Sequence, residues 1–484
     1  TLFPYTTLFR STDQVRAFTV DQVQAFSTAQ VHALKTDQLA ALTTTQVASL
    51  TSGQITALGT AQTASMLTTQ IQSVTTEALA GLEILDLQAM STDQVRAFTN
   101  DQLQALSTAQ VHAFKTDQLA ALTTTQVASL TSLQIAALST TQVAAFGTAQ
   151  IAAMTNDELA GLNTADIAGL SSAQLAALST DQLTSMDADL IAAIETNDIA
   201  GLTTAQVEAL TTEQFSAMTT GQLGALTTAQ FAAVTSGQLG SLSNTNVTAL
   251  TTGQMAILTT DQLRGLTTDQ LTAIETRDLN AMTSDVIRAL STEQVAALST
   301  TQVQGLSTSH IAAMTSDQIG ALETSDYQVL SSAQLRVLSA AQIGALSPEQ
   351  VEAISTTGLP GLTTDNIQAL TTLQVASLTT AQIQALTNTQ IGALQVSQVA
   401  ALPSASITAL TTGQIHALST DQVQSLTIDQ IPGLEIEDVA ALRTDHIMAM
   451  STEQLSAFNA SQIAAITTTQ VGVMTSEQRS TLGL

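Results

Sequence analysis

Polar and apolar residues follow a strict period of eight from Ser11 to the end of the chain. A glutamine, or a residue standing in for it, recurs at every eighth position from Gln14 to Gln478 without an insertion or deletion, which gives about 59 octapeptides. The consensus is Leu-Thr-Thr-Asp-Gln-Val-x-Ala, as in Leu418–Ser425. A fixed period of this kind is typical of a stack of equivalent parts. We therefore expect residues 11–484 to form a single continuous array.

Each octapeptide carries the signals of a helix start. The first Thr stands three residues before Gln, which is the spacing of a capping box, and the flanking Leu and Val can form a hydrophobic staple. The residue before Gln is often acidic, as at Asp93 and Asp421, where a negative charge meets the positive end of the helix dipole. Pro348 stands at the first helical position, where its missing N–H costs nothing. The sequence thus predicts one short helix per octapeptide.

Replacements of the glutamine support this prediction, because most of them are polar and can still cap. These polar replacements include Asp86, Glu158, Asp166, Asp198, Asn246, Asp278, Asp326, Asn366 and Asp438. The exceptions are Ala78, Leu190, Val286 and Gly358.

The other positions predict which face of each helix is buried. Leu and Val stay apolar and should form the core. The residue before Leu is small nearly everywhere, for example Ala17, Gly81 and Ser377, so neighbouring backbones should approach closely there. The residue between Val and Ala varies freely, as Arg16 and His32 illustrate, and should face solvent.

These elements predict an all-α fold, an elongated solenoid of very short capped helices. The sequence does not fix the number of helices per coil, for which we take roughly two as an expectation. One continuous helix is excluded, because eight residues are about 2.2 turns and the apolar stripe would rotate around the axis. A helix of one and a half turns is not stable alone, so stacking must hold it. The alternative is a parallel β-solenoid, but Leu and Val stand at opposite parity and one strand would bury both faces. Pro360 and Pro432 fall inside predicted helices and should mark irregular repeats.

Composition narrows the range of partners. The chain carries 39 acidic and 11 basic residues, a formal charge of −28, with no basic stripe for phosphate, so we expect no nucleic-acid partner. Cysteine is absent, which excludes a disulfide framework, a thiolate nucleophile and a Cys-based zinc site. No run of 18 apolar residues exists, so we expect no membrane span in the visible part.

Candidate chemistry is sparse. No histidine has a second His or a Cys at ligand spacing; three of the five stand at the solvent position and two replace the capping glutamine. They are His32, His112, His310, His416 and His446. Rows of Asp could hold Ca²⁺ weakly, but neither an EF-hand nor a Gly-rich nonapeptide loop is present. Equivalent units cannot supply a single activated Ser, and no phosphate-binding loop occurs. We predict no enzyme activity and no catalytic, cofactor or metal site.

The first ten residues do not follow the repeat. Thr1–Arg10, together with Ser11, resemble the in-frame translation of a short-read sequencing adapter. We expect residues 1–10 to be a non-native leader, with the true N-terminus missing. The alternative is a genuine apolar N-terminal cap.

The octapeptide array from Ser11 to about Met474 resembles the Thr/Gln/Ala-rich tracts of very large bacterial exported proteins, adhesin-like or haemolysin-type. The resemblance implies a structural spacer or stalk in a secreted or cell-surface protein and transfers no binding residue. Ser11–Leu50 recurs almost unchanged as Ser91–Leu130, so length changes by whole blocks, as a spacer allows. The alternative is a repetitive scaffold for a protein, a polysaccharide, or an ice or mineral surface bound through rows of Thr, with Tyr327 as the one conspicuous aromatic residue.

Overall fold

A computed structural model of the chain describes residues 11–484, and the leader predicted at residues 1–10 lies outside the described residues. Within residues 11–484 all regular secondary structure is helical, as 56 α-helices and three 3₁₀-helices, with no strand. The all-α prediction is therefore confirmed, and the β-solenoid alternative is wrong.

The helices keep the eight-residue register of the sequence. They begin at every eighth residue, from α1 (Thr12–Arg16) to α56 (Ser476–Leu482). Only the 3₁₀-helices η2 (Leu359–Gly361) and η3 (Ile431–Gly433) begin three residues late. Most α-helices have five or six residues. The four-residue helices are α5 (Thr44–Val47), α9 (Thr76–Leu79), α15 (Thr124–Val127), α19 (Asn156–Leu159) and α30 (Thr252–Met255), and α56 (Ser476–Leu482) has seven.

Capping explains why such short segments are helical. At α24 (Thr204–Ala209) the side chain of Thr203 accepts the N–H of Gln206 at 3.2 Å, and Oε1 of Gln206 accepts the N–H of Thr203 at 2.7 Å. This is the predicted capping box, and it recurs in most helices of both units.

Many of the helices end where the chain takes up extended dihedrals. After α26 (Thr220–Ala225), Leu226 has φ −57° and ψ 125°, and Thr227 has φ −62° and ψ 158°. These two extended residues turn the chain into the next helix.

The irregular repeats predicted at the two internal prolines are present. Pro360 lies in η2 (Leu359–Gly361) and Pro432 in η3 (Ile431–Gly433), so each octapeptide keeps only a single 3₁₀ turn. Loss of the proline N–H and the ring's demand for space explain the shortened helix.

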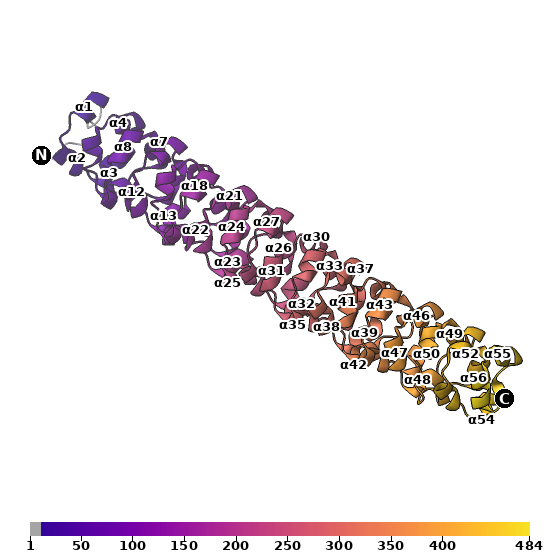
Figure 1. Cartoon of the computed structure of the whole chain (residues 1–484). Helices are drawn as coiled ribbons and strands as arrows, with labels where there is room; N and C mark the ends of the chain where they lie inside the picture. The colour runs from indigo at the N-terminus through magenta and orange to yellow at the C-terminus, as the bar shows by residue number, and fades with distance from the viewer. Residues whose placement is uncertain (1–10) are drawn as a thin grey trace. The chain divides into compact units, whose positions relative to one another are not determined.

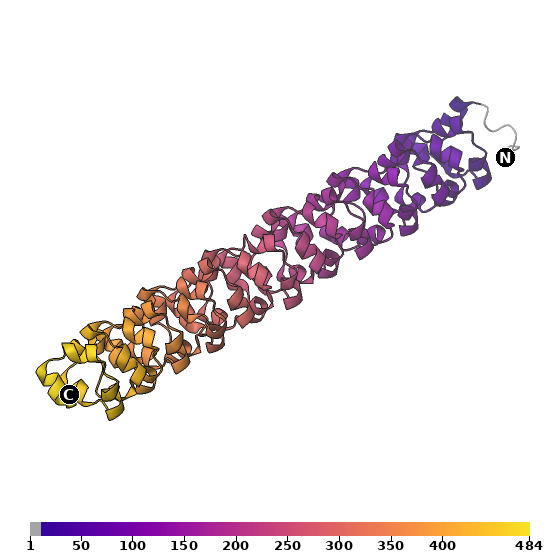
Figure 2. The same ribbon diagram turned by 90° about the vertical axis from the view of Figure 1, so that its right-hand side faces the viewer.

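The described part of the chain divides into two compact units, residues 11–242 and 243–484. Within the first unit, a helix packs against the third helix after it, as α4 (Thr36–Ala40) packs against α7 (Thr60–Ser65). The second unit follows the same rule, as α46 (Asn388–Ala393) packs against α49 (Thr412–Ala417). Figures 1 and 2 show the short helices of each unit winding into a coil. The expectation of two helices per coil is wrong, because the packing places three to four helices in each coil.

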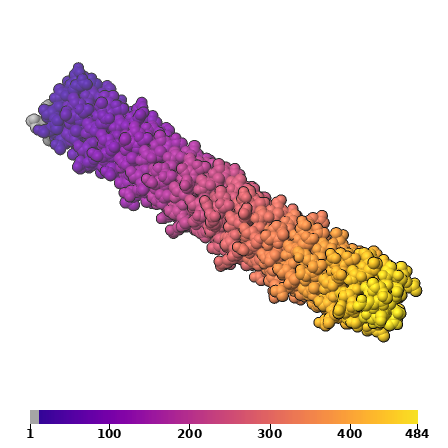
Figure 3. Space-filling model, in the orientation of Figure 1, coloured from indigo at the N-terminus to yellow at the C-terminus, as the bar shows by residue number. Residues whose placement is uncertain are grey.

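The core of each unit consists of the predicted Leu and Val positions. Val207 and Leu210 in the first unit and Val423 and Leu426 in the second are all buried. The position between Val and Ala is exposed, as Glu208 shows. On the face visible in Figure 3, colour bands follow one another in chain order within each unit, as expected when a coil touches only its neighbours.

The small position before Leu brings successive coils into backbone contact. A Cβ built on Gly81 would overlap the backbone carbonyl of Ser52, 29 residues earlier, and one built on Gly361 would overlap that of Ser332. The close approach predicted from the small residues is therefore present in both units.

Candidate functional site: the ladder between successive coils

The glutamine of each octapeptide, which we call the ladder position, makes contacts in two directions. In the first unit, Oε1 of Gln238 accepts the N–H of Thr235 at 2.8 Å, so it caps its own helix. Its Nε2 donates to the carbonyl oxygens of Leu210 at 2.7 Å and Val207 at 2.9 Å, which lie 28 and 31 residues earlier. One side chain thus joins the start of one helix to the end of a helix in the preceding coil.

The same geometry recurs in the second unit. Gln454 accepts the N–H of Ser451 at 3.0 Å and donates to Leu426 O at 2.7 Å and Val423 O at 3.0 Å. A coil therefore closes after about 28 residues, between three and four octapeptides.

The ladder solves a problem that very short helices create. The first four N–H groups and the last four carbonyls of any helix lack partners within it, so in a helix of five residues almost no backbone group is hydrogen-bonded within the helix. Gln238 and Gln454 are nearly completely buried, and an unpaired buried polar group costs about 1–3 kcal/mol. Each ladder amide satisfies a donor at one helix start and acceptors at another helix end, which makes stacking and helix formation a single event.

Asn366 shows that a side chain one methylene shorter can do the same work. Its Oδ1 accepts the N–H of Thr363 at 2.9 Å, and its Nδ2 donates to Leu338 O, 28 residues earlier, at 2.8 Å. Asn366 is buried, with 2% of its surface exposed.

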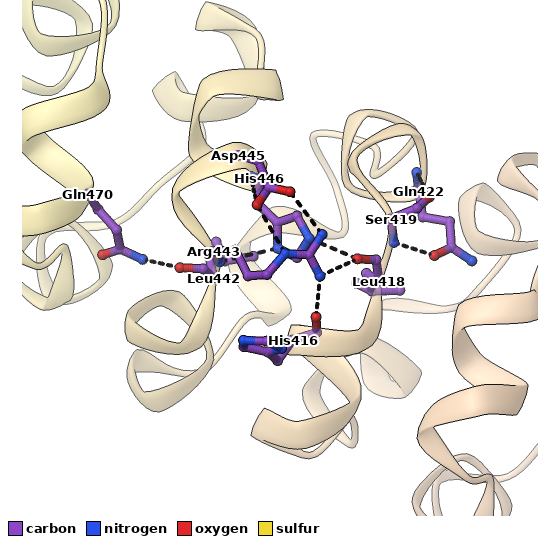
Figure 4. A network of polar contacts seen from close by, with 9 residues as sticks. All are labelled: His416, Leu418, Ser419, Gln422, Leu442, Arg443, Asp445, His446 and Gln470. Carbon is purple, nitrogen blue, oxygen red and sulfur yellow. Dashed lines mark hydrogen bonds and ion pairs between the residues drawn. The ribbon is translucent and has the colours of Figure 1, made fainter.

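His446 reproduces the amide with an imidazole ring (Figure 4). Its Nδ1 accepts the N–H of Arg443 at 3.3 Å, and its Nε2 lies 2.8 Å from Leu418 O. A carbonyl only accepts, so these two bonds require a neutral ring with its proton on Nε2. Burial lowers the pKa of His446, which favours this neutral form, while the bond to Leu418 opposes the shift.

Arg443 strengthens the same junction from the surface. Its guanidinium donates to the carbonyl oxygens of His416 and Leu418 and pairs with Asp445, whose Oδ1 is 3.0 Å from Nε (Figure 4). Leu418 O therefore receives both an imidazole and a guanidinium donor.

His310 performs only half of the task. Its Nε2 lies 3.0 Å from Met282 O, 28 residues earlier, but its buried Nδ1 has no hydrogen-bond partner among the described residues. The N–H of Ser307, which a glutamine would cap, donates instead to Oδ1 of Asn280 at 3.1 Å. Burial lowers the pKa of His310.

Carboxylates at the ladder position fall into two groups. Three of them turn to a hydroxyl 26 residues earlier: Asp166 accepts from Thr140 at 3.2 Å, Asp198 accepts from Ser172, and Asp278 accepts from Thr252. These hydroxyls donate to the carboxylate, so a hydrogen bond still joins the two coils, although through a different pair of atoms.

The second group, Asp86, Glu158, Asp326 and Asp438, lacks such a hydroxyl bond. Three of these groups still accept the cap N–H, as Glu158 does from Thr155 at 2.6 Å. All four are nearly completely buried. Burial raises the pKa of each carboxyl group, and raises that of Asp438 to about 6.

Leu190 occupies the ladder position but has no side-chain group that can form a hydrogen bond. By the register of its neighbours, a glutamine there would donate to Leu162 O, and no other described group donates to that carbonyl. Leu159, Leu162 and Leu190 line a cavity of about 330 Å³.

The remaining histidines lie on the outside, as their solvent position predicts. Nδ1 of His32 lies 3.0 Å from Ala57 O, and Nδ1 of His112 lies 2.7 Å from Ala137 O, while the His416 side chain is exposed. Among residues 11–484, no three His, Cys, Asp or Glu side chains gather in an arrangement that could hold a metal ion. No helix among the same residues has the length and apolar character needed to cross a bilayer.

Tyr327, the conspicuous aromatic residue of the sequence, is fully buried and is not a surface contact. Its hydroxyl donates to Ile319 O at 2.5 Å, and burial raises the pKa of the phenol. The sequence identified the capping role of the ladder glutamine but not its second bond, because a partner 28 residues away depends on the size of the coil.

A family model described as the ALTTAQ repeat matches eleven stretches that together cover more than half of the chain. The matched residues are 23–52, 79–116, 100–132, 130–156, 156–188, 191–228, 271–308, 295–324, 319–356, 399–435 and 431–468. No curated protein matches the sequence.

Proposed function

We propose a structural role for this chain, which belongs to the ALTTAQ repeat family. The role is that of a spacer or stalk region within a large bacterial surface or secreted protein, without catalytic activity. It rests on the near-equivalence of the octapeptides, because most of them carry the same cap and the same ladder bonds in both units.

The observation that supports it best is the duplicated block. Gln46 donates to Phe18 O at 2.7 Å, and Gln126, 80 residues later, donates to Phe98 O at 2.7 Å. The two copies of the block therefore make the same ladder contact at equivalent positions. A segment whose length changes by whole units while its structure persists suits a spacer.

The surface is consistent with this role. The chain has 39 acidic and 11 basic residues. Repulsion between copies of this acidic chain favours solubility, and repulsion between its carboxylates and phosphate groups disfavours nucleic acid as a partner. A placement outside the cell, in an adhesin-like protein, follows from the resemblance of the octapeptides to exported tracts and is part of the proposal.

Block deletions test the proposal. Removing residues 91–170 joins Met90 to Ser171 and keeps the register, so every ladder position regains an equivalent partner. We expect the helical content per residue to stay the same and any activity of an attached module to be retained. Deleting only residues 91–94 should disrupt the stack locally, because caps and ladder bonds then meet wrong partners.

The alternative is a repetitive scaffold that binds a protein, a polysaccharide, or an ice or mineral surface. The large apolar side chains Leu133 and Leu373 are 72% and 74% exposed, which a scaffold could use. Binding assays on the block deletions separate the two functions. A single block whose loss abolishes binding would contradict the spacer.

A further inference from the structure

Four ladder carboxyl groups receive no hydroxyl donor from the preceding coil, so each places only acceptor atoms opposite a carbonyl oxygen of that coil. By the 28-residue register, Asp86 faces Leu58 O, Glu158 faces Leu130 O, Asp326 faces Leu298 O and Asp438 faces Leu410 O, as Gln94 faces Met66 O and Gln454 faces Leu426 O. No described group donates to these four carbonyls. Oδ2 of Asp86 and Oδ1 of Asp326 are buried without a hydrogen-bond partner among the described residues.

An ionised carboxylate cannot donate, whereas a protonated one has an O–H donor and keeps an acceptor. The protonated Asp then matches Asn366 in size and in hydrogen-bonding pattern. Because Asn366 both caps its helix and reaches Leu338 O at 2.8 Å, a side chain of this length spans the gap between coils.

We propose that Asp86, Glu158, Asp326 and Asp438 are proton-binding sites whose occupation completes the ladder and fastens successive coils to each other in mildly acidic solution. In neutral solution the same junctions are loosened, while the glutamine junctions are unchanged. The effect is confined to these four ladder positions and does not depend on whether the chain serves as a spacer.

The charges around these groups favour proton uptake. Near Asp438, Glu435 and Glu437 are acidic, and in the packed helices α49 and α54 (Ala460–Ala465) the only titratable residue is the exposed His416. Near Asp326 the neighbours are Glu323 and, in α42 (Pro348–Ala353), Glu349 and Glu352, with none in α36 (Thr300–Gly305).

The first unit repeats this pattern. The titratable neighbours of Asp86 are Glu83 in its own octapeptide and His112 in α13 (Thr108–His112), and α7 contains no titratable residue. His32 also lines an open groove of about 590 Å³ together with Glu83 and Asp86. Glu158 has Asp157 beside it and no titratable residue in α16 (Ser132–Ala136). No Lys or Arg is among these neighbours, so the proton has no fixed cation to compete with.

The sign of the pH effect follows from linkage. The Asp438 pKa rises from 3.8 to about 6 on folding, so the folded state binds more protons than the unfolded state between these values. Its stabilisation is present below pH 3.8 and is lost as pH rises through 6. Since each pKa unit is a tenfold change in equilibrium, this group alone shifts the unfolding equilibrium roughly hundredfold.

The test compares two quadruple variants of the full chain. The ladder variant carries Asp86→Asn, Glu158→Gln, Asp326→Asn and Asp438→Asn. The surface variant carries Asp93→Asn, Asp181→Asn, Asp317→Asn and Asp421→Asn, which change the net charge equally at exposed positions. Thermal unfolding is followed by circular dichroism between pH 4 and pH 8.

We expect the ladder variant to unfold at a higher temperature than the parent at pH 7.5. The unfolding temperature of the parent should fall between pH 4.5 and pH 7.5, and that of the ladder variant should fall much less. The surface variant should keep that fall. Equal pH profiles for the two variants, or a ladder variant less stable than the parent at pH 7.5, would overturn the proposal.

A direct titration provides the second measurement. Carboxyl carbon shifts of the parent, labelled at Asp, should include a group with a midpoint near pH 6 that disappears in Asp438→Asn. If no labelled carboxyl titrates above pH 5, the proton-binding site at Asp438 does not exist.

Discussion

His446 lies with its Nε2 2.8 Å from the carbonyl oxygen of Leu418, the residue 28 positions earlier, in the place where other octapeptides use a glutamine amide. The ring can occupy this place only while it is neutral, because its Nδ1 must accept the N–H of Arg443. This junction therefore responds to acid in the opposite sense to the ladder carboxyl groups.

Acid should weaken the parent at His446. The folded-state pKa lies below 6.5, mainly because the ring is buried, so its contribution is complete above pH 6.5 and is lost as pH falls below that value. His446→Gln should unfold at a higher temperature than the parent at pH 5 and within a degree or two at pH 8. His416→Gln, at an exposed position of the same unit, serves as the control and should leave the pH profile nearly unchanged.

The small position should be intolerant of added volume. Gly81→Ala should destabilise the first unit by about 1–3 kcal/mol, because the new methyl group overlaps the Ser52 carbonyl. Gly53→Ala should instead stabilise it by about 0.5–1 kcal/mol, since Gly53 lies within α6 (Ser52–Thr56) with open space around it. Chemical denaturation of both variants measures the difference, and effects of the same sign would show that the coils do not approach as closely as described.

Restoring an amide at ladder position 190 should restore the missing hydrogen bonds between two coils. Leu190→Gln should stabilise the first unit by about 1 kcal/mol, because its amide can cap the N–H of Asp187 and donate to Leu162 O. Leu190→Met changes the shape without adding an amide and should bring no gain. If the two substitutions have equal effects on the unfolding midpoint, the empty carbonyl is not a vacant ladder site.

The sequence predicts the local structure well because the local signals are complete within eight residues. The cap at Thr203, the acceptor of Gln206 and the buried Val207 and Leu210 all follow from the consensus. Pro360 and Pro432 likewise mark the weakened helices, because a proline inside a helix of six residues removes a donor that the helix needs.

The coil size could not be predicted in the same way. The period fixes the phase within an octapeptide, whereas the number of helices per coil depends on the turn made by two extended residues such as Leu226 and Thr227. Without that number, neither the bond from Gln238 to Leu210 nor the burial of carboxyl groups such as Asp438 could be inferred. The expectation of Tyr327 as a surface contact is wrong, because it occupies the Val position of its octapeptide and is buried.

Replacing one ladder glutamine with glutamate tests directly whether that residue joins two coils. Glutamate is as good as glutamine in a capping box, so a residue that only capped its own helix would tolerate Gln238→Glu. In the ladder, the substitution removes the donors to Leu210 O and Val207 O and buries a charge, since Gln238 is 1% exposed. Gln30→Glu is the matched control, because Oε1 of Gln30 accepts the Ser27 N–H at 2.8 Å while its Nε2 has no partner among the described residues.

The free energy of unfolding of the two variants is measured at pH 7.5 and again at pH 4.5. We predict that Gln238→Glu loses at least about 2 kcal/mol at pH 7.5, recovers most of it at pH 4.5 where the carboxyl group regains a donor, and that Gln30→Glu stays within about 0.5 kcal/mol of the parent. A Gln238→Glu variant as stable as the parent at pH 7.5 would contradict the ladder.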